Sequence, residues 1–265
     1  MKNIVITGST RGIGLCMAKE FLRADCNVTI SGRGRKLSGK LEKELDSFSS
    51  QIIYIACDVS KANEVERLWK QSKEKWGSID IWINNAGQNC PYEYCYETET
   101  DHIDALIDTN IKGMIYGSQI ASKNMLTQGS GQIWNMEGLG SNGMIQERTI
   151  LYGTSKRALR YFTKGLAREL KGTPVKAGRL SPGMMLTDFI TKTPDGDKSP
   201  VIENKGFKFI FNALGDRPET VASFFIPRIL ANTKNDALIA WLTNAKTIWR
   251  FILSPLNKNR LLQEK

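Results

Sequence analysis

Val5-Ile6-Thr7-Gly8-Ser9-Thr10-Arg11-Gly12-Ile13-Gly14 lies almost at the amino terminus of the chain. The apolar run 4–6 predicts a short strand buried on both faces, and a helical pattern of apolar residues follows over 13–22. Glycines let the backbone approach a ligand closely, and the free N–H groups and dipole of a helix N-terminus favour an anion. The spacing differs from the more familiar Gly-x-Gly-x-x-Gly. Its place between a strand and a helix nevertheless favours a dinucleotide phosphate cradle over a plain tight turn.

The bulk properties indicate one ordinary soluble domain. A length of 265 residues, with 41% hydrophobic and 24% charged residues, suits a single α/β domain with an ample core. We expect no signal peptide, because only four residues separate Lys2 from the start of Thr7-Gly8. We also expect no membrane span, because no run of roughly 18 apolar residues exists. The net charge of +10 is spread without a nucleic-acid motif, so we expect solvation and an anionic cofactor rather than nucleic acid.

The cysteines are odd in number and scattered along the chain. Their spacings match no metal motif, and the single histidine, His102, makes a metal site less favoured still. We therefore expect no metal and a reducing, cytoplasmic setting. The five cysteines are Cys16, Cys26, Cys57, Cys90 and Cys95.

The end of the second predicted strand, residues 27–31, indicates which dinucleotide binds. An NAD site usually places an acidic residue here for the ribose hydroxyls, but this chain has Gly32 followed by Arg33. Arg11 adds a second guanidinium from the glycine loop. Two guanidinium groups and no carboxylate suit a 2′-phosphate, so we predict NADP(H). The alternative is that both arginines are only solvated parts of a basic turn.

Two further strand ends carry polar or small residues. Residues 52–56 predict a third strand that leads to Asp58, which could accept from an adenine amino group or cap the helix that starts near Ser60. Residues 79–83 predict a fourth strand, followed by Asn84-Asn85-Ala86-Gly87. Small residues there would let a flat cofactor pass over the sheet.

Two predicted helices carry candidate chemistry. Asn110 interrupts a helical pattern that runs from residue 100 to about 127, and asparagine is a poor mid-helix residue, so we expect a functional carbonyl or a local kink. Tyr152 and Lys156 stand four residues apart in a helix that runs to about residue 170, so they share one face. A nearby ammonium stabilises a phenolate and lowers the tyrosine pKa toward the range of a general acid or base.

Taken in order, these motifs resemble the short-chain dehydrogenase/reductase family over about residues 3–190. The resemblance implies an α/β, Rossmann-type, doubly wound parallel sheet of about seven strands in a single domain, with hydride transfer at nicotinamide. It implies that Tyr152 exchanges a proton with the substrate, that Lys156 lowers the tyrosine pKa and holds the nicotinamide ribose, and that Asn110 fixes a relay water. The implied cofactor residues are Gly8, Thr10, Arg11, Gly12, Ile13, Gly14, Arg33, Asp58, Val59, Asn85, Ala86, Gly87, Tyr152, Lys156, Pro182, Gly183 and Thr187.

One residue of the family pattern is missing. A serine normally follows three residues after the asparagine that ends the fifth strand, but here Asn135 is followed at that spacing by Gly138. The nearest hydroxyl is Ser141, which we expect on a flexible loop. Either Ser141 substitutes, or the substrate carbonyl lacks that hydrogen bond, whose loss costs ~3–4 kcal/mol in other enzymes.

The segments 135–141, 152–160 and 180–188 look like the chlorophyll b reductase branch of the family. That branch implies NADPH-dependent reduction of a formyl group on a macrocycle. A small keto substrate with Ser141 as donor is the alternative, as is a cofactor-binding regulatory protein with weak turnover. We expect residues 184–217 to form a substrate lid, in which Phe207, Phe209 and Phe211 alternate as a packed edge or a ligand wall.

We place the cofactor domain at residues 1–242 and a basic, amphipathic segment of the same domain at 243–265. That segment carries Trp249 and Phe251 among Arg250, Lys258 and Arg260. A helix of this kind can lie on an anionic membrane surface, but packing on its own domain or on a second subunit is favoured. The resemblance also implies a homodimer or homotetramer through the helices that contain Asn110 and Tyr152.

Overall fold

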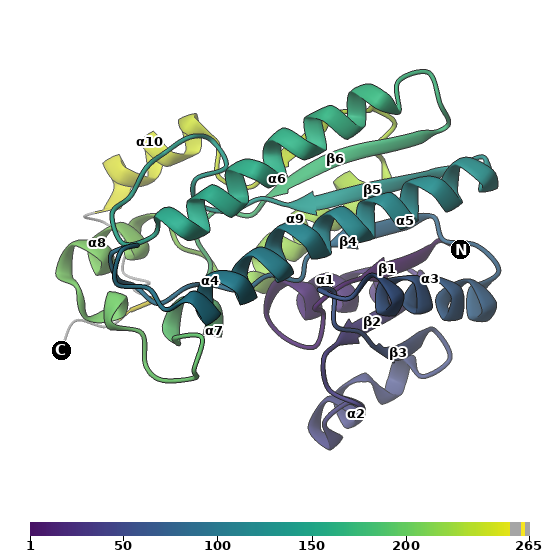
Figure 1. Ribbon diagram of the computed structural model, residues 1–265, viewed down its shortest axis with the longest axis horizontal. Coiled ribbons are helices and arrows are strands. Elements are labelled where there is room, and N and C mark those ends of the chain that lie inside the picture. The colour runs from purple at the N-terminus through teal and green to yellow at the C-terminus, as the bar shows by residue number, and fades with distance from the viewer. Residues whose placement is uncertain (255–260, 263–265) are drawn as a thin grey trace.

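The computed structural model describes residues 1–254 and 261–262. Seven parallel strands form one sheet in the order β3-β2-β1-β4-β5-β6-β7, with helices on both faces (Figure 1). The predicted doubly wound parallel sheet is therefore confirmed. The strands are β1 Asn3–Ile6, β2 Asn27–Gly32, β3 Ile52–Ala56, β4 Ile81–Asn84, β5 Gly131–Met136, β6 Val175–Ser181 and β7 Ala237–Ala240.

Two helical layers bury the two faces of the sheet. Apolar side chains of α1 and α9 pack with those of α2 on one face, and α3, α5 and α6 cover the other. The longer helices are α1 Gly12–Arg23, α2 Gly39–Leu45, α3 Ala62–Trp76, α4 Thr100–Ile107, α5 Gly113–Gln128, α6 Ile150–Glu169, α8 Lys205–Leu214, α9 Pro218–Leu230 and α10 Asn244–Leu253. The shorter ones are α7 Asp188–Thr191, η1 Asp46–Phe48, η2 Asp108–Lys112 and η3 Pro200–Glu203.

The central strands are apolar on both faces because both faces are covered. In β1, Ile4 and Ile6 belong to one core and Val5 to the other, and all three are fully buried. In β4, Trp82 packs beneath α3 and α5, with its ring centroid 5.8 Å from that of Trp69. Burying a large apolar side chain contributes about 1.5–3 kcal/mol, so these two cores hold the strands in register.

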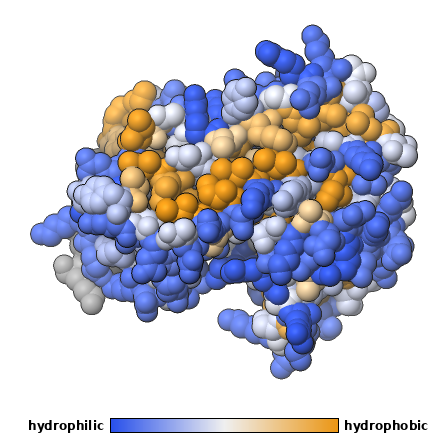
Figure 2. Space-filling model, viewed as in Figure 1, coloured by the Kyte–Doolittle hydropathy of each residue, from blue (hydrophilic) through white to orange (hydrophobic). Residues whose placement is uncertain are grey.

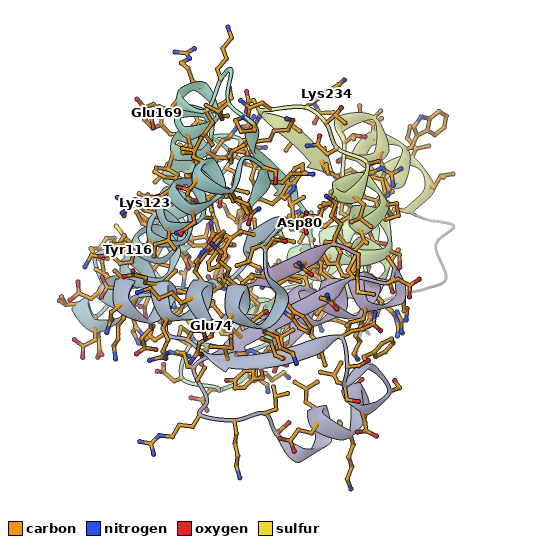
Figure 3. All side chains as sticks on the ribbon, turned by 90° about the vertical axis from the view of Figure 1, so that its right-hand side faces the viewer. Glu74, Asp80, Tyr116, Lys123, Glu169 and Lys234 are labelled. Carbon is orange, nitrogen blue, oxygen red and sulfur yellow. The ribbon has the colours of Figure 1, made fainter. Side chains whose placement is uncertain are left out.

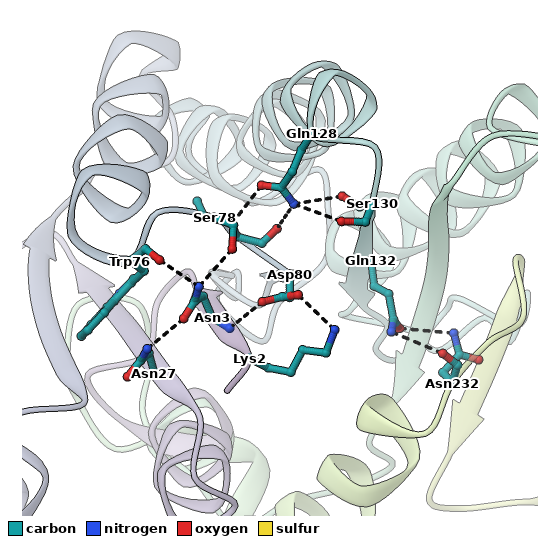
Figure 4. Close-up of polar contacts among 11 residues, drawn as sticks. Lys2, Asn3, Asn27, Trp76, Ser78, Asp80, Gln128, Ser130, Gln132 and Asn232 are labelled. Atoms are coloured by element: carbon teal, nitrogen blue, oxygen red, sulfur yellow. Dashed lines mark hydrogen bonds and ion pairs between the residues drawn. The ribbon is translucent and has the colours of Figure 1, made fainter.

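A polar network fastens the amino ends of the strands, opposite the end that carries the predicted site (Figure 4). The Asp80 carboxylate accepts hydrogen bonds from the Asn3 backbone N–H at 2.8 Å and from Lys2 Nζ at 3.0 Å. The Gln128 amide donates to the Ile79 carbonyl at 3.0 Å. Figure 3 views this end, with Asp80 near the middle of the molecule. These bonds hold the amino ends of the strands together, at the end of the sheet away from the predicted site.

Asn110 and the phenylalanines of the predicted lid both lie on helical segments. The helical pattern over residues 100–127 is interrupted at Asn110 by a π-helical turn, η2, whose geometry departs from a regular α-helix. These phenylalanines lie on helix α8, where Phe207 and Phe211, one turn apart, pack against each other with ring centroids 5.6 Å apart. Phe209 faces α10 instead, 6.5 Å from the ring of Phe251.

The lid and α10 gather at the carboxyl ends of the strands, at the left of Figure 1. Asp216 joins the two ends of the predicted lid segment, because it pairs with Met185 in an isolated bridge. Its carboxylate also accepts a hydrogen bond from Trp241 Nε1 at 2.6 Å. Arg250 of α10 donates to the same carboxylate at 3.1 Å. The predicted basic residues Lys258 and Arg260 lie outside the described residues. No helix among the residues that are described is long and apolar enough to cross a membrane.

Candidate active site

One large cleft of about 2160 Å³ opens at the carboxyl ends of the strands. The strand order reverses between β1 and β4, and ligands of open α/β sheets bind at such a switch point. The loops after β1, β4 and β5 line it on one side, and residues of the predicted lid segment, 184–217, line it on another. Its volume is well above the roughly 300–1,000 Å³ of an ordinary ligand site, so it has room for a dinucleotide and a second large molecule.

The glycine loop is held against the loop that follows β4. Gly8 has a left-handed φ of 60°, and a Cβ there would lie 2.7 Å from Ala86 Cα, so only glycine allows this approach. The Asn85 amide donates to the carbonyls of Thr7 and Gly8, both at 2.9 Å. Asn85 thus fixes the shape of the loop, and the cradle in front of α1 fits a phosphate group.

The end of the cleft where we predict adenosine contains the two predicted arginines. Arg11 and Arg33 are exposed, and both line the cleft beside Gly32. Arg11 also lies 4.0 Å from the carboxylate of Asp188 in the lid, a loose contact. Two exposed guanidinium groups at this point, one of them with only a loose partner, suit a 2′-phosphate.

Asp58 forms local hydrogen bonds in the turn before α3, whose N-cap is Lys61, and its contact with an adenine stays a prediction. Its Oδ1 accepts hydrogen bonds from the backbone N–H of Ser60 at 3.1 Å and from the Ser60 hydroxyl at 2.8 Å, in the turn that leads into α3. The residue also lines the cleft. Its local bonds hold the carboxylate at the edge where an adenine would lie.

The chemical end of the cleft is formed by α6 and the loop after β5. Tyr152 lies one turn before Lys156, whose Nζ donates to the Met136 carbonyl at 3.1 Å and is 5.7 Å from the tyrosine ring centroid. Phe189 of the lid contacts the same ring edge-on, with centroids 5.5 Å apart. The tyrosine hydroxyl is therefore held between the β5 loop and the lid.

Burial, rather than the neighbouring ammonium, dominates the titration of this pair. Burial raises the pKa of Tyr152 above its ordinary value, and the lowering expected from Lys156 stays a prediction. Burial also lowers the pKa of Lys156 to about 8. A tyrosine that stays protonated is suited to donate a proton, which is what reduction of a carbonyl needs.

Asn110 lies behind the cleft wall and is buried. Its side-chain carbonyl accepts from the Gln88 N–H at 2.7 Å, and its amide donates to the Gln88 carbonyl at 2.9 Å and to the Ser155 hydroxyl at 3.1 Å. The side chain therefore ties the loop after β4 to α6. The π-helical turn around it leaves the main chain irregular at this point, as such turns often do at functional sites.

The position of the missing serine is filled by the tyrosine hydroxyl. A Cβ at Gly138 would lie 2.4 Å from Tyr152 Oη. Ser141 is buried rather than on the expected flexible loop, because its Oγ accepts from the Gly138 N–H at 3.0 Å and its carbonyl accepts from Arg157 at 3.1 Å. Since Oγ already accepts a bond from the backbone, the Ser141 hydroxyl hydrogen can be donated to a ligand.

The structure brings all of the predicted cofactor residues, and Ser141, to the wall of the one cleft, including Val59, Pro182, Gly183 and Thr187. Sequence reasoning missed Phe189 and the buried acid Glu137, which also line it. For Glu137 a signal was present, because a carboxylate stands directly before Gly138, in the segment that departs from the family pattern.

The fold and this cleft together define a dinucleotide-binding oxidoreductase. A family model described as short chain dehydrogenase matches residues 2–198. The chain belongs to the short-chain dehydrogenase/reductase family.

Two plant chloroplast proteins and one solved structure are among its relatives. The chain is 32% identical over its whole length to probable chlorophyll(ide) b reductase NYC1 of Arabidopsis thaliana, but it spans only 55% of that protein. It is 33% identical to chlorophyll(ide) b reductase NOL of the same plant, over 99% of this chain and 77% of the relative. The structure of ElxO with NADP bound is 28% identical, with a TM-score of 0.77 and coverage of 90% of this chain and 96% of that one. The chain thus spans about half the length of the first relative.

Proposed function

We propose that the chain uses NADPH to reduce an aldehyde or ketone to an alcohol. The observation that carries this proposal is the meeting of Tyr152, Lys156 and the loop after β5 at the chemical end of a cleft whose other end presents a phosphate cradle and two arginines. When bound, the cofactor supplies the hydride. The glycine loop and helix α1 would hold its pyrophosphate, and Arg11 and Arg33 its 2′-phosphate.

In this proposal Tyr152 is the general acid that donates its phenolic proton to the carbonyl oxygen. Burial keeps that proton in place at neutral pH. Lys156, held by the Met136 carbonyl, holds the nicotinamide ribose and offers positive charge to the developing phenolate. The main-chain carbonyl of Asn110 is the group we assign to a relay water, because the side-chain amide is already committed.

Ser141 is the hydrogen-bond donor that we assign to the substrate carbonyl. It is buried and fixed to the N–H of Gly138, the residue whose added Cβ would meet the tyrosine hydroxyl, and it lines the cleft. A donor that is already in place costs no reorganisation during the reaction.

For the substrate we propose a large, flat, mostly apolar aldehyde, such as a formyl group on a chlorophyll-type macrocycle. Three features support this: the names of the plant relatives, the size of the cleft, and an aromatic lid in which Phe189 and Phe207 line the wall. Broad contact with a ring system would help to orient the carbonyl. The alternative is a small keto substrate. The fixed hydroxyl of Ser141 supports it, because this hydroxyl can supply an oxyanion donor without help from a macrocycle.

The two substrate classes can be separated with one variant. Wild type and Ser141→Ala should be assayed for NADPH oxidation on small ketones and on porphyrin-type aldehydes. The macrocycle proposal expects turnover of the porphyrin-type aldehyde, with a smaller loss in Ser141→Ala than the ~10²–10³-fold typical of a lost oxyanion donor. Turnover of small ketones alone, abolished in Ser141→Ala, would reject it.

We also propose that two chains or more associate through α5 and α6. Leu126, Ile150 and Tyr161 of these helices are exposed, and Figure 2 shows an apolar band along this face of the molecule. Light scattering should then give a dimer or tetramer. A monomer at micromolar concentration would reject the assembly.

For α10 we propose contact with an anionic membrane surface through its outer face. Arg250 and Phe251 pack this helix on its own domain, as the sequence favoured, yet Ile248, Trp249 and Ile252 remain exposed. Sedimentation with phosphatidylglycerol vesicles should remove the protein from solution, and Trp249→Glu should weaken this. Equal recovery with and without vesicles would reject the contact. The cytoplasmic location stays a prediction from the scattered cysteines, whose thiols are free.

A further inference from the structure

A buried acid lies directly behind the chemical end of the cleft. Glu137 follows the last residue of β5, is 4% exposed, and donates its backbone N–H to the Leu180 carbonyl at 2.7 Å. Its Oε1 lies 3.9 Å from Arg160 Nε on α6 and 3.8 Å from an Arg179 nitrogen on β6. Burying an ionised carboxylate this deeply costs free energy of folding unless a cation pairs with it. The cations around Glu137 are therefore the first candidates for its partner.

The two arginines contact the carboxylate only loosely. Distances of 3.8–3.9 Å are too long for hydrogen bonds, and Glu137 Oε1 and Arg179 Nε have no hydrogen-bond partner among the described residues. Arg179 has a stronger partner elsewhere, because it donates to the Asp236 carboxylate at 2.8 Å. Neither arginine therefore accounts for the buried acid by itself.

Lys156 is a third cation whose charge acts on this carboxylate, and it is 4% exposed. Its Nζ bonds the carbonyl of Met136, the residue before Glu137. A Cβ built on Gly138, the residue after Glu137, would lie 3.3 Å from Lys156 Cε. Arg160, which contacts the acid, is one turn beyond Lys156 on the same helix face. Glu137 thus stands between Met136, whose carbonyl bonds the lysine, and Gly138, where an added side chain would meet the lysine.

We propose that Glu137 is a positioning residue, the counter-charge that keeps Lys156 an ammonium ion in its buried place. The inference rests on the proposed function, which gives Lys156 its role beside Tyr152. Arg179 has Asp236, and the Arg160 side chain is 26% exposed to water. Lys156 has neither, and Glu137 is the acidic group that acts on it among the described residues.

The charges that face this pair set the direction of the effect. Burial lowers the pKa of Lys156, and the charge of Glu137 opposes that lowering. Burial raises the pKa of Glu137, while Arg160, Arg179, a hydrogen bond with Ser181 and Lys156 itself lower it. Removing the carboxylate should let the lysine lose its proton at lower pH. A unit charge several ångströms away shifts a pKa by on the order of one unit at an effective dielectric constant near 20.

The first test is the pH profile of carbonyl reduction at saturating NADPH, with the best aldehyde from the substrate panel. Wild type should lose activity as the pH rises through about 8, the pKa of Lys156. In Glu137→Gln this loss should begin about one pH unit lower, which leaves about fivefold less activity than wild type at pH 8 and little difference at pH 6. Glu137→Gln/Arg160→Gln, which removes one charge of each sign, serves if the single variant does not fold.

Asp236→Asn is the matched control, because it removes the other carboxylate of the cluster and keeps a residue that tolerates the left-handed φ of 53°. In Asp236→Asn the loss of activity at high pH should occur at the same pH as in wild type. The inference would be overturned if Glu137→Gln lost activity at the same pH as wild type, or if Asp236→Asn shifted this pH by as much as Glu137→Gln. If the proposed function itself were wrong, the result would be different: wild type would show no NADPH oxidation that Tyr152→Phe removes.

The second test needs no substrate and no cofactor. A double-mutant cycle of Glu137→Gln and Lys156→Met, measured by urea unfolding, should show coupling at pH 6.5 that is lost at pH 9.5, where the lysine is neutral. A purely structural role for Glu137 gives a coupling that does not change with pH. That result, or no coupling at either pH, would overturn the inference.

Discussion

A Cβ atom at Gly138 would lie 2.4 Å from Tyr152 Oη, so a side chain at position 138 and this placement of the tyrosine hydroxyl exclude each other. The missing serine is therefore part of how the site is built. Its hydrogen-bonding group is supplied from Ser141, which is anchored to the backbone of the same glycine at 3.0 Å.

Restoring the serine should therefore harm the protein. Gly138→Ser would push the end of the tyrosine ring aside, and a displacement of about 1 Å can cost ~10²-fold in rate. We expect a fall of at least about tenfold in kcat/KM for carbonyl reduction, with little change in the free energy of unfolding, because the ring end can turn. Gly165→Ser on α6, the helix that carries Tyr152, is the control, since nothing lies within 4 Å of its added Cβ. A Gly138→Ser enzyme as fast as the parent would contradict this account.

The arginines at the adenosine end should determine the choice of cofactor. Arg33→Ala and Arg11→Ala each remove a charge-assisted contact worth ~1.5–3 kcal/mol, and only NADPH has the 2′-phosphate that uses it. Calorimetry should show a loss of about tenfold or more for NADPH and little loss for NADH. Arg35→Ala, a neighbouring exposed cation that does not line the cleft, should affect neither. Equal losses for both cofactors would rule out the assignment.

The buried ammonium of Lys156 should be visible in the pH dependence of stability. Burial lowers its pKa to about 8, whereas a lysine in the unfolded chain titrates near ~10.4. Between these values the unfolded state binds the extra proton, so this group makes the protein more stable as the pH rises, and its burial costs stability below about 8.

Lys156→Met removes that titration. The free energy of unfolding of wild type minus that of the variant should rise by about 2 kcal/mol between pH 8 and pH 9.5, at ~1.36 kcal/mol per unit. Urea unfolding at both pH values measures this difference in the free energy of unfolding. Lys70→Met is the control, because Lys70 is an exposed lysine on α3. A difference that stays flat would show that the lysine keeps its ordinary pKa in the folded protein.

Much of this molecule follows from local sequence patterns. The apolar runs, the glycine loop and the helix from Tyr152 onward were predictable, because strand burial, turn geometry and helix periodicity depend on neighbours in the chain. The helical state of Phe207–Phe211 was not, since alternate aromatics in a short segment fit a strand equally well and only packing on α10 decides.

The chemistry of the site was only partly predictable. The sequence placed Tyr152 and Lys156 on one face, but the direction of the tyrosine pKa depends on how deeply the fold buries it. The burial of Ser141 and the position of Glu137 depend on contacts with α6 and β6, which are far away in the sequence.

Oxidation of NADPH by the wild type and by Tyr152→Phe, on the same carbonyl panel, tests the central claim most directly. Phenylalanine keeps the ring that packs against Phe189 and removes only the hydroxyl. We predict that the variant binds NADPH as tightly as the parent and turns over at least ~10²-fold more slowly, the loss expected for a missing general acid. A Tyr152→Phe enzyme that reduces the same aldehyde at the parental rate would contradict the account.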